Sequence, residues 1–159
     1  MNTVVRIHPV VRIPPPLLFV LTFLAGVGLQ QLLPIPTPPA ALARAGHFAG
    51  FALLAAGVLM ALSCMGLFLL SRTTIIPHRT ASKMITRGPY RLTRNPMYLS
   101  LVLAFLGVAG ILTQLWPLIL LPIPVLVVHS VVIPYEEARM RDAFGESFEA
   151  YCGRVGRWL

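Results

Sequence analysis

Four long runs without Asp, Glu, Lys or Arg dominate this sequence and leave few folds open to it. They cover residues 17–33, 45–70, 96–113 and 118–133, and the charged residues lie almost entirely between and around them. A helix of about 20 apolar residues crosses a hydrocarbon core of about 30 Å. With 57% hydrophobic and 11% charged residues, the chain is also too apolar for a soluble domain. The sequence predicts an all-α integral membrane protein with about four transmembrane helices.

The first run could also be read as a cleaved signal peptide. It follows an arm with Arg6, Arg12 and a run of prolines, and Ala41-Leu42-Ala43 resembles a cleavage site. However, residues 17–33 are long for the apolar part of a signal peptide, and the proline-rich residues 34–39 suit a loop outside the bilayer. We therefore expect a retained first span.

The second and third runs predict closely packed helices. Residues 45–70 carry glycines that would let a neighbouring helix approach: Gly46, Gly50, Gly57 and Gly66. Asn95-Pro96 before the third run is typical of a helix start, with Asn95 as the cap and Pro96 in the first turn.

The third and fourth runs should form a helical hairpin. Residues 114–117 (Gln-Leu-Trp-Pro) predict a tight turn between them, and Pro122 and Pro124 predict an irregular start to the fourth helix. A tight hairpin would bring the start of the third helix close to the end of the fourth.

Basic residues indicate which way the chain crosses the membrane. Residues 71–95 carry six Lys or Arg and no acid, which places this loop in the cytoplasm by the positive-inside rule. With four spans, both termini also lie in the cytoplasm. Twelve of the 13 Lys and Arg residues are then on the cytoplasmic side, and Arg44 is the exception. We expect an integral protein of a bacterial cytoplasmic membrane. The net charge of +8 comes without a nucleic-acid recognition motif, so it does not indicate nucleic-acid binding.

The last part of the chain predicts an amphipathic helix on the cytoplasmic side. All five acids lie within the 14 residues 136–149, and apolar residues recur there at helical spacing: Phe144, Phe148, Tyr151 and Val155. Cys64 and Cys152 form neither a disulfide framework nor a metal-ligand pair. We divide the chain into residues 1–71, an arm with two spans, and residues 72–159, a catalytic region.

Two polar clusters should meet at the cytoplasmic side. Residues 88–98 (Gly-Pro-Tyr-Arg-Leu-Thr-Arg-Asn-Pro-Met-Tyr) lead into the third run, and Glu136-Glu137 follows the fourth. His129 precedes Glu136 by seven residues, two helical turns, and either points toward the cluster or bonds to a neighbouring helix. Charged groups at a bilayer boundary cost free energy unless they are paired or bind a ligand. These residues therefore predict a site for a polar ligand.

The side chains of this site suit a ligand with a carboxylate, an ammonium group, a ribose and a purine. Arginines can hold the carboxylate, glutamates can accept from the ammonium or the ribose hydroxyls, and tyrosines can flank the base. S-adenosylmethionine has these groups. Residue chemistry alone does not separate it from a nicotinamide dinucleotide.

The order of the motifs resembles the isoprenylcysteine carboxyl methyltransferase family and, more broadly, the membrane methyltransferases that include phospholipid N-methyltransferases. The resemblance covers roughly residues 72–157. The matching residues are His78-Arg79, Gly88-Pro89-Tyr90-Arg91, Arg94-Asn95-Pro96-Met97-Tyr98, Glu136-Glu137, Phe144-Gly145, Tyr151 and Arg154-Val155.

The resemblance implies S-adenosylmethionine as cofactor and roles around it for Arg94, Asn95, Pro96, Tyr98 and the Glu136-Glu137 pair. Asn95 stands where the eukaryotic pattern has histidine, so a titratable group is missing there. For the cofactor pocket the full set of candidates is His78, Gly88, Pro89, Tyr90, Asn95, Pro96, Tyr98, His129, Glu136 and Glu137.

The function that the resemblance implies is methyl transfer to an apolar or lipid-like acceptor that enters from the bilayer, with a carboxylate as one candidate acceptor. We expect Arg94, with Arg154 second, to orient an anionic acceptor through charge-assisted hydrogen bonds. No metal site is expected, and the oligomeric state stays open. The alternatives are an NADPH-dependent membrane reductase and a non-catalytic assembly protein whose basic loop contacts anionic lipid.

Overall fold

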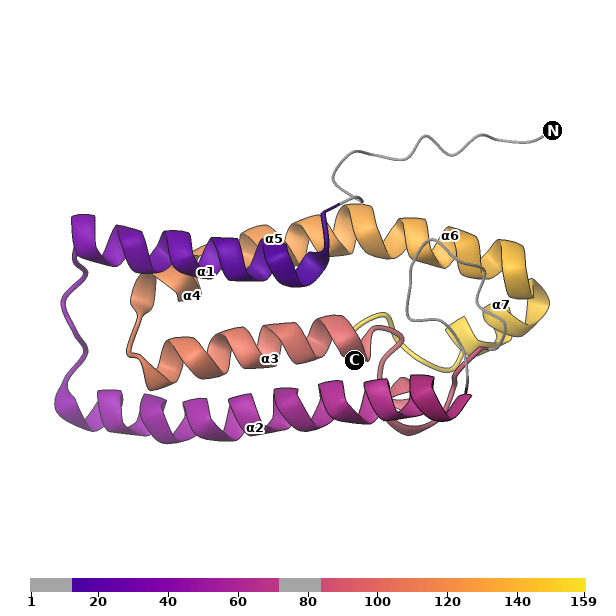
Figure 1. The fold of residues 1–159 in the computed structure, drawn as a ribbon, viewed down its shortest axis with the longest axis horizontal. Helices are drawn as coiled ribbons and strands as arrows, with labels where there is room; N and C mark the ends of the chain where they lie inside the picture. The colour runs from indigo at the N-terminus through magenta and orange to yellow at the C-terminus, as the bar shows by residue number, and fades with distance from the viewer. Residues whose placement is uncertain (1–12, 72–83) are drawn as a thin grey trace.

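The computed structural model describes residues 13–71 and 84–159, and all the regular structure in them is helical (Figure 1). Three helical stretches are long and apolar enough to cross a membrane, and a fourth apolar helix has 16 residues. This confirms the predicted all-α membrane fold. The elements in chain order are α1 (Pro15–Leu32), α2 (Ala40–Ser71), the 3-10 turn η2 (Gly88–Arg91), α3 (Pro96–Ile111), α4 (Leu115–Leu120), α5 (Pro122–Val127), the π-helical turn η3 (Val128–Val132), α6 (Ile133–Phe144) and α7 (Glu146–Cys152).

The helices form a bundle in which α3 lies between two outer layers. Figure 1 shows α2 along one side of α3, and α1 with the stretch from α4 to α6 along the other. Phe19 and Phe23 of α1 meet Phe105 of α3 edge to face, with ring centroids 6.1 and 5.1 Å apart. Val128 and Ile133, both fully buried, complete the core between these layers.

Contacts between α2 and α3 are made backbone to backbone. A Cβ added at Gly50 would lie 2.7 Å from the Gly107 carbonyl oxygen, and one added at Gly107 would lie 2.6 Å from the Leu54 nitrogen. Gly57 meets the Ser100 carbonyl in the same way, at 2.8 Å. The predicted close approach is confirmed for these glycines. Gly46 and Gly66 have open space around their Cβ positions, so the expected need for glycine in packing is wrong at these two residues.

The connection between α3 and the fourth span differs from the prediction. The turn lies at Leu112 and Thr113, and the predicted turn residues Trp116 and Pro117 already belong to α4. The fourth span is divided at Leu121, between α4 and α5, which agrees with the predicted irregular start of the fourth helix. Pro122 and Pro124 lie in the first turn of α5, where a missing N–H costs no helical hydrogen bond, and Leu121 keeps helical angles (φ −52°, ψ −37°).

The fourth span continues without interruption into the region predicted to be a separate amphipathic helix. Leu115–Phe144 is one helical stretch that contains the π-helical turn η3 just before Pro134, where a proline removes a helical hydrogen bond. The chain turns only at Gly145 (φ +50°), so the predicted single amphipathic helix is divided between α6 and α7. Phe148 and Tyr151 of α7 are buried, so its apolar side packs under the bundle.

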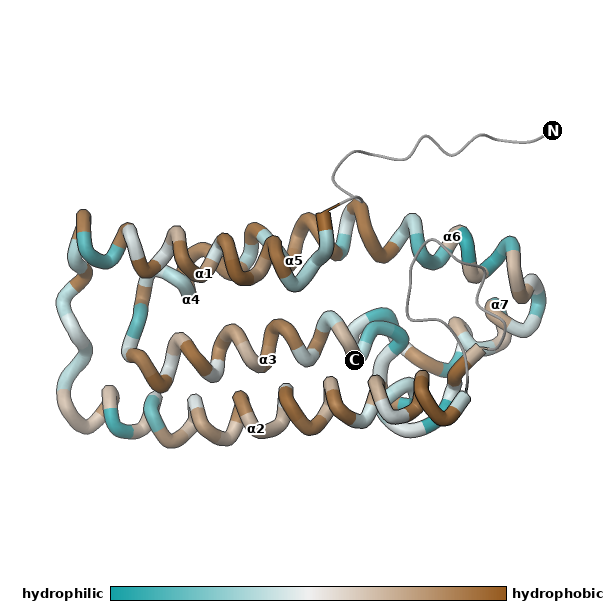
Figure 2. Tube along the Cα trace, in the orientation of Figure 1, coloured by the Kyte–Doolittle hydropathy of each residue, from teal (hydrophilic) through white to brown (hydrophobic). Residues whose placement is uncertain are grey.

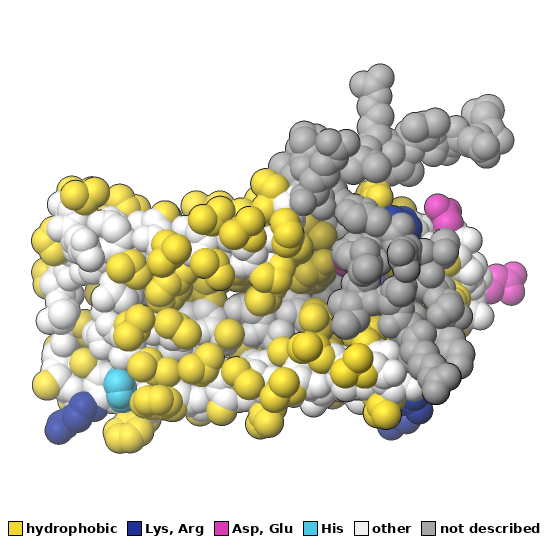
Figure 3. Space-filling view, viewed as in Figure 1, with side chains coloured by type: hydrophobic (Ala, Val, Ile, Leu, Met, Phe, Trp, Pro, Cys, Tyr) yellow, Lys and Arg dark blue, Asp and Glu magenta, His cyan; other side chains and the backbone are white. Residues whose placement is uncertain are grey.

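The outer surface separates into an apolar middle and a polar end. Figure 2 shows hydrophobic residues along the bundle, and Figure 3 shows apolar side chains over its middle with charged side chains at its ends. Leu59 and Leu69 of α2 are 64% and 72% exposed, as expected for side chains that face lipid. Residues 84–95 and 135–159 form what we call the polar end. The start of α2, which contains Arg44, lies at the opposite end of the bundle (Figure 1).

Candidate functional site

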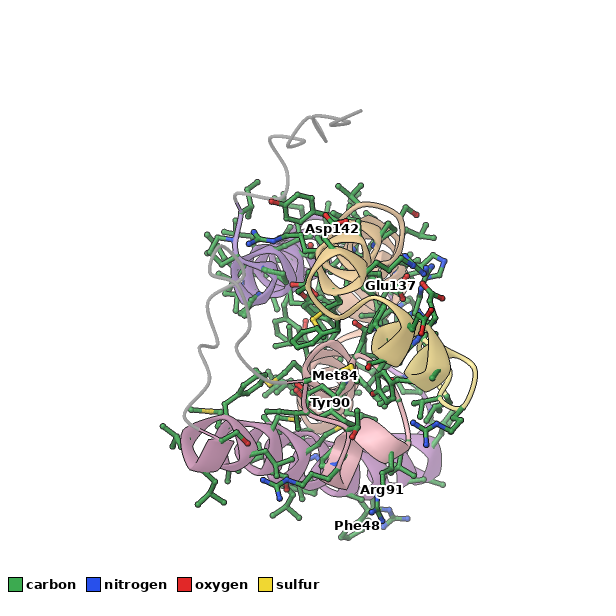
Figure 4. The ribbon with its side chains drawn as sticks, turned by 90° about the vertical axis from the view of Figure 1, so that its right-hand side faces the viewer. Phe48, Met84, Tyr90, Arg91, Glu137 and Asp142 are labelled. Carbon is green, nitrogen blue, oxygen red and sulfur yellow. The ribbon has the colours of Figure 1, made fainter. Side chains whose placement is uncertain are left out.

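Three segments from distant parts of the sequence meet at the polar end. They are residues 88–95 before α3, the start of α6, and residues 153–159, which we call the C-terminal segment. Figure 4 looks onto this end and shows Glu137 on the α7 side of α6 and Tyr90 near the middle, with Arg91 at the outer edge. The hydrogen bonds between the three segments define the candidate site.

Glu137 lies at the centre of this site and is only 6% exposed. Its Oε2 accepts a hydrogen bond from Arg157 Nη2 (2.6 Å) and its Oε1 accepts one from Arg157 Nε (3.1 Å). Arg94 Nη2 lies 3.4 Å from the same Oε1. The two guanidinium groups share one carboxylate, which leaves the cluster one positive charge in excess. The hydrogen bonds that Arg157 donates to Glu137 also raise the pKa of Arg157 above its ordinary value.

Arg94 is held by the bundle on several sides. Its side chain is 14% exposed, its Nη1 contacts the Cys152 sulfur, and its backbone N–H donates to the Gly156 carbonyl (2.9 Å). Its Nε is buried and has no hydrogen-bond partner among the described residues. A buried donor without a partner costs free energy, so this atom is a candidate contact for a bound anion.

Asn95 anchors the C-terminal segment instead of capping α3. It occupies the cap position before Pro96, as predicted, but its side chain makes no capping bond. Its Nδ2 donates to the Arg157 carbonyl (2.9 Å), which also accepts from Thr93 Oγ1 (3.1 Å). The same Thr93 oxygen accepts from the Asn95 backbone N–H (3.1 Å), and this bond holds the turn into α3.

Tyr98 and Glu136 join α3 to α6. The tyrosine hydroxyl donates to Glu136 Oε1 over 2.6 Å. This bond confirms that the start of the third helix and the end of the fourth span lie together, as the hairpin argument predicted. Within residues 13–71 and 84–159, the second carboxylate oxygen of Glu136 makes no hydrogen bond, so it can accept from a ligand.

Tyr90 lies in η2 between α2 and α7. Its carbonyl accepts from the Tyr151 hydroxyl (2.7 Å) and its ring meets Phe68 edge to face at 6.2 Å. Burial raises the pKa of Tyr90 above its ordinary value and raises that of Tyr151 to about 12, the latter partly opposed by Arg94. Gly88 starts this turn with φ +63°, and a Cβ there would lie 2.9 Å from Leu67 Cδ1. Gly88 and Pro89 therefore shape the turn that places Tyr90.

His129 bonds to the C-terminal segment. Its Nδ1 accepts from the Trp158 indole Nε1 (3.0 Å), and the two rings stack 25° from parallel. The expectation that seven residues place His129 and Glu136 on one face assumed a regular α-helix. The wider turn of η3 changes that register. The alternative, a hydrogen bond to a neighbouring element, describes His129 better.

The structure brings together most of the predicted site residues but not all of them. Arg94, Asn95, Tyr98, Glu136 and Glu137 meet at the polar end, and Pro96 is buried in the first turn of α3. Arg154 is exposed and its Nε donates to the Ala150 carbonyl (3.2 Å), so it is not brought to the cluster. His78 lies outside the described residues.

Sequence reasoning missed Arg157 and Trp158. Both lie in the C-terminal segment. Arg157 pairs with Glu137, whereas Arg154, the arginine expected at the site, does not reach it. The available signal was Glu137 itself, because a buried carboxylate needs a cation as a partner. Within residues 13–71 and 84–159, no group of three His, Cys, Asp or Glu side chains could hold a metal ion.

Comparison with known proteins identifies one family. The family model described as phospholipid methyltransferase, which is one of the isoprenylcysteine carboxyl methyltransferase-like membrane enzymes, matches residues 45–147. This region contains α2, η2, α3, the fourth span and the start of α7. No curated protein and no solved structure matches the chain.

Proposed function

The chain belongs to the phospholipid methyltransferase family and is a membrane methyltransferase; from this premise we propose that it uses S-adenosylmethionine to methylate an apolar or lipid-like acceptor that enters from the bilayer. The observation that carries the proposal is the buried cluster of Arg94, Arg157 and Glu137 beside the Tyr98–Glu136 pair. Family membership supports neither the reductase nor the assembly protein as an alternative.

The residues at the polar end fit the groups of S-adenosylmethionine. The excess positive charge and the unpartnered Nε of Arg94 suit its carboxylate. Glu136 retains an oxygen that can accept from its ammonium group or its ribose hydroxyls, and Tyr90 and Tyr98 offer aromatic faces for its adenine. When bound, S-adenosylmethionine would supply a methyl group activated by an adjacent sulfonium.

The chain's contribution to catalysis is binding, orientation and the exclusion of water. Thr93 and Pro96 have no exposed surface and Glu137 has almost none, so the wall of the site is dry. A methyl displacement depends on the alignment of its reactants and on desolvation more than on a strong base. Arg94 remains the residue that we propose to orient the donor carboxylate or an anionic acceptor.

We place the site at the cytoplasmic side of the membrane. Besides Arg94 and Arg157, the polar end carries five arginines among the described residues, whereas the opposite end carries one, Arg44. The five are Arg87, Arg91, Arg139, Arg141 and Arg154. This distribution follows the positive-inside rule.

Methyl transfer to extracted lipids tests the proposal. The protein, reconstituted in vesicles, would receive S-adenosylmethionine labelled in its methyl group together with lipid fractions that carry an amine, a carboxylate or a thiol. We expect label to enter one fraction, and Glu136→Ala to abolish this while Glu146→Ala, a change at an exposed acid of α7, leaves it intact. No incorporation into any fraction, or oxidation of NADPH by the same vesicles, would contradict the proposal.

A further inference from the structure

The C-terminal segment (residues 153–159) makes polar contacts with both walls of the site. At the turn before α3, the Gly156 carbonyl accepts a hydrogen bond from the Arg94 backbone N–H, and the Arg157 carbonyl accepts one from the Asn95 side chain. Against the fourth span, its Arg157 guanidinium binds Glu137 and its Trp158 indole binds His129 (Figure 4 shows the place of Glu137). Leu159, by contrast, is 88% exposed. The polar contacts of Gly156 and Arg157 are therefore made with site residues, whereas Trp158 packs against the hydrophobic core and bonds to His129.

Arg157 sets the charge that Arg94 presents. With both arginines present, Glu137 is bound bidentately by Arg157 and only weakly approached by Arg94, 3.4 Å away. Without the Arg157 charge, Glu137 would be neutralised by Arg94 alone and the cluster would lose its excess positive charge. The carboxylate of S-adenosylmethionine would then meet a neutral Arg94–Glu137 pair instead of a net positive charge, and should bind more weakly.

Trp158 sets the protonation pattern of the His129 ring. An indole N–H can only donate, so the Nδ1 that faces it must be an unprotonated acceptor. The neutral ring consequently carries its proton on Nε2 and presents that atom as a donor. The stacked ring of Trp158 also fixes the orientation of the imidazole, because the two planes lie 25° apart.

We propose that Arg157 is a positioning residue of the donor site, which acts through Glu137 and sets the affinity for S-adenosylmethionine, and that Trp158 fixes the tautomer of His129. The proposal rests on the proposed function. It extends the site beyond residues 45–147, the region that the family comparison matches, to a segment that the comparison does not reach.

Charge substitution at Arg157 tests the first half. We expect Arg157→Gln to weaken binding of S-adenosylmethionine about tenfold and Arg157→Lys, which keeps the charge, to restore most of that loss. Arg141→Gln is the matched control, because Arg141 also pairs with a glutamate (Glu149, 2.6 Å) but is exposed, and it should leave binding unchanged. Equal binding by wild type and Arg157→Gln would overturn the inference. So would equal losses in the Gln and Lys variants, since these would indicate a purely structural bond.

The role of Trp158 is tested by measuring the tautomer of His129 in the absence of S-adenosylmethionine. Nitrogen-15 spectra of His129 in wild type should show a protonated Nε2 and an unprotonated Nδ1, and Trp158→Phe should convert this to a mixture. Trp116→Phe is the matched control, because the Trp116 indole also donates one hydrogen bond, to the Leu33 carbonyl (2.7 Å) at the opposite end. Unchanged His129 spectra in Trp158→Phe would overturn the role of Trp158.

The two experiments separate this inference from the proposed function. If wild type binds S-adenosylmethionine but Arg157→Gln binds it equally well, the positioning role is wrong and the function stands. If wild type does not bind it, the function is wrong, and the affinity role falls with it, whatever the His129 spectra show.

Discussion

The interface between α2 and α3 and the polar end hold the same bundle together by different means. At the interface, glycines bring the two backbones into contact, and Gly107 has no room for a side chain. At the polar end, hydrogen bonds of side chains join separate elements: the Arg157 guanidinium binds Glu137, and the Arg157 carbonyl accepts from Thr93 and Asn95. The first region should therefore be sensitive to added volume and the second to lost charge. Changes in the first should affect folding alone, and changes in the second should affect stability, ligand binding or both.

The largest effect should come from adding volume at the interface. Gly107→Val would place side-chain atoms within contact of the Leu54 backbone nitrogen, 2.6 Å from the added Cβ. Backbone atoms cannot move aside as a flexible side chain can, so the variant should fail to accumulate as a folded protein, at a cost of about 3 kcal/mol or more. Gly66→Ala, in open space on α2, is the control. Yields and unfolding temperatures in detergent would show the difference, and similar values for both variants would contradict the packing account.

The second largest effect should come from removal of the Glu137 carboxylate. Glu137→Ala leaves Arg94 and Arg157 close together without their shared anion, which should destabilise the protein by about 3 to 5 kcal/mol. Chloride or another small anion should recover part of this stability, because it can replace the carboxylate. Chemical unfolding with and without added salt measures both effects. A variant as stable as wild type would mean that the two arginines do not depend on Glu137.

Loss of Arg94 should separate function from fold. Arg94→Ala leaves Glu137 paired one to one with Arg157, so the fold should be retained. Turnover should fall by about a hundredfold or more, since a charge-assisted contact to the ligand is lost. Arg91→Ala, at the exposed outer edge of η2, is the control. Normal turnover of Arg94→Ala in the methyl-transfer assay would remove Arg94 from the catalytic residues.

The smallest effect should be the alkaline dependence of stability. Burial raises the pKa of Tyr151 to about 12 from an ordinary value of 10, so the folded protein holds this proton more tightly than the unfolded chain. The resulting stability is complete below pH 10 and is lost as the pH rises to 12. Tyr151→Phe should cost about 1 kcal/mol at neutral pH, through the lost bond to the Tyr90 carbonyl, and should flatten this dependence. Unfolding curves at pH 8 and 11 test it, and equally steep losses in both proteins would assign the dependence to other groups.

Hydropathy predicted the spans well because lipid excludes charge from them. It could not fix their ends. Arg44 lies inside α2, because an arginine near a helix end can reach the interface, and Pro122, Pro124 and Pro134 are all accommodated in first turns of helical segments. The sequence shows where a proline lies, whereas its effect depends on which hydrogen bonds the surrounding helix still needs.

The order of the helices along the chain was enough to predict one part of the site but not the other. Tyr98 and Glu136 meet because a hairpin has to bring the ends of its helices together, and this was predictable. The choice between Arg154 and Arg157 was not, because the two arginines lie three residues apart in the same segment. Only the return of that segment toward Thr93 and Asn95 directs Arg157 inward and leaves Arg154 in solvent.

Titration of S-adenosylmethionine into the purified protein tests the central claim most directly. Calorimetry on wild type, in detergent and again in lipid, should show binding with a dissociation constant of about a micromolar, and Glu136→Ala should abolish it while NADPH gives no signal. If S-adenosylmethionine binds in neither medium, or binds Glu136→Ala as tightly as wild type, the polar end is not the donor site.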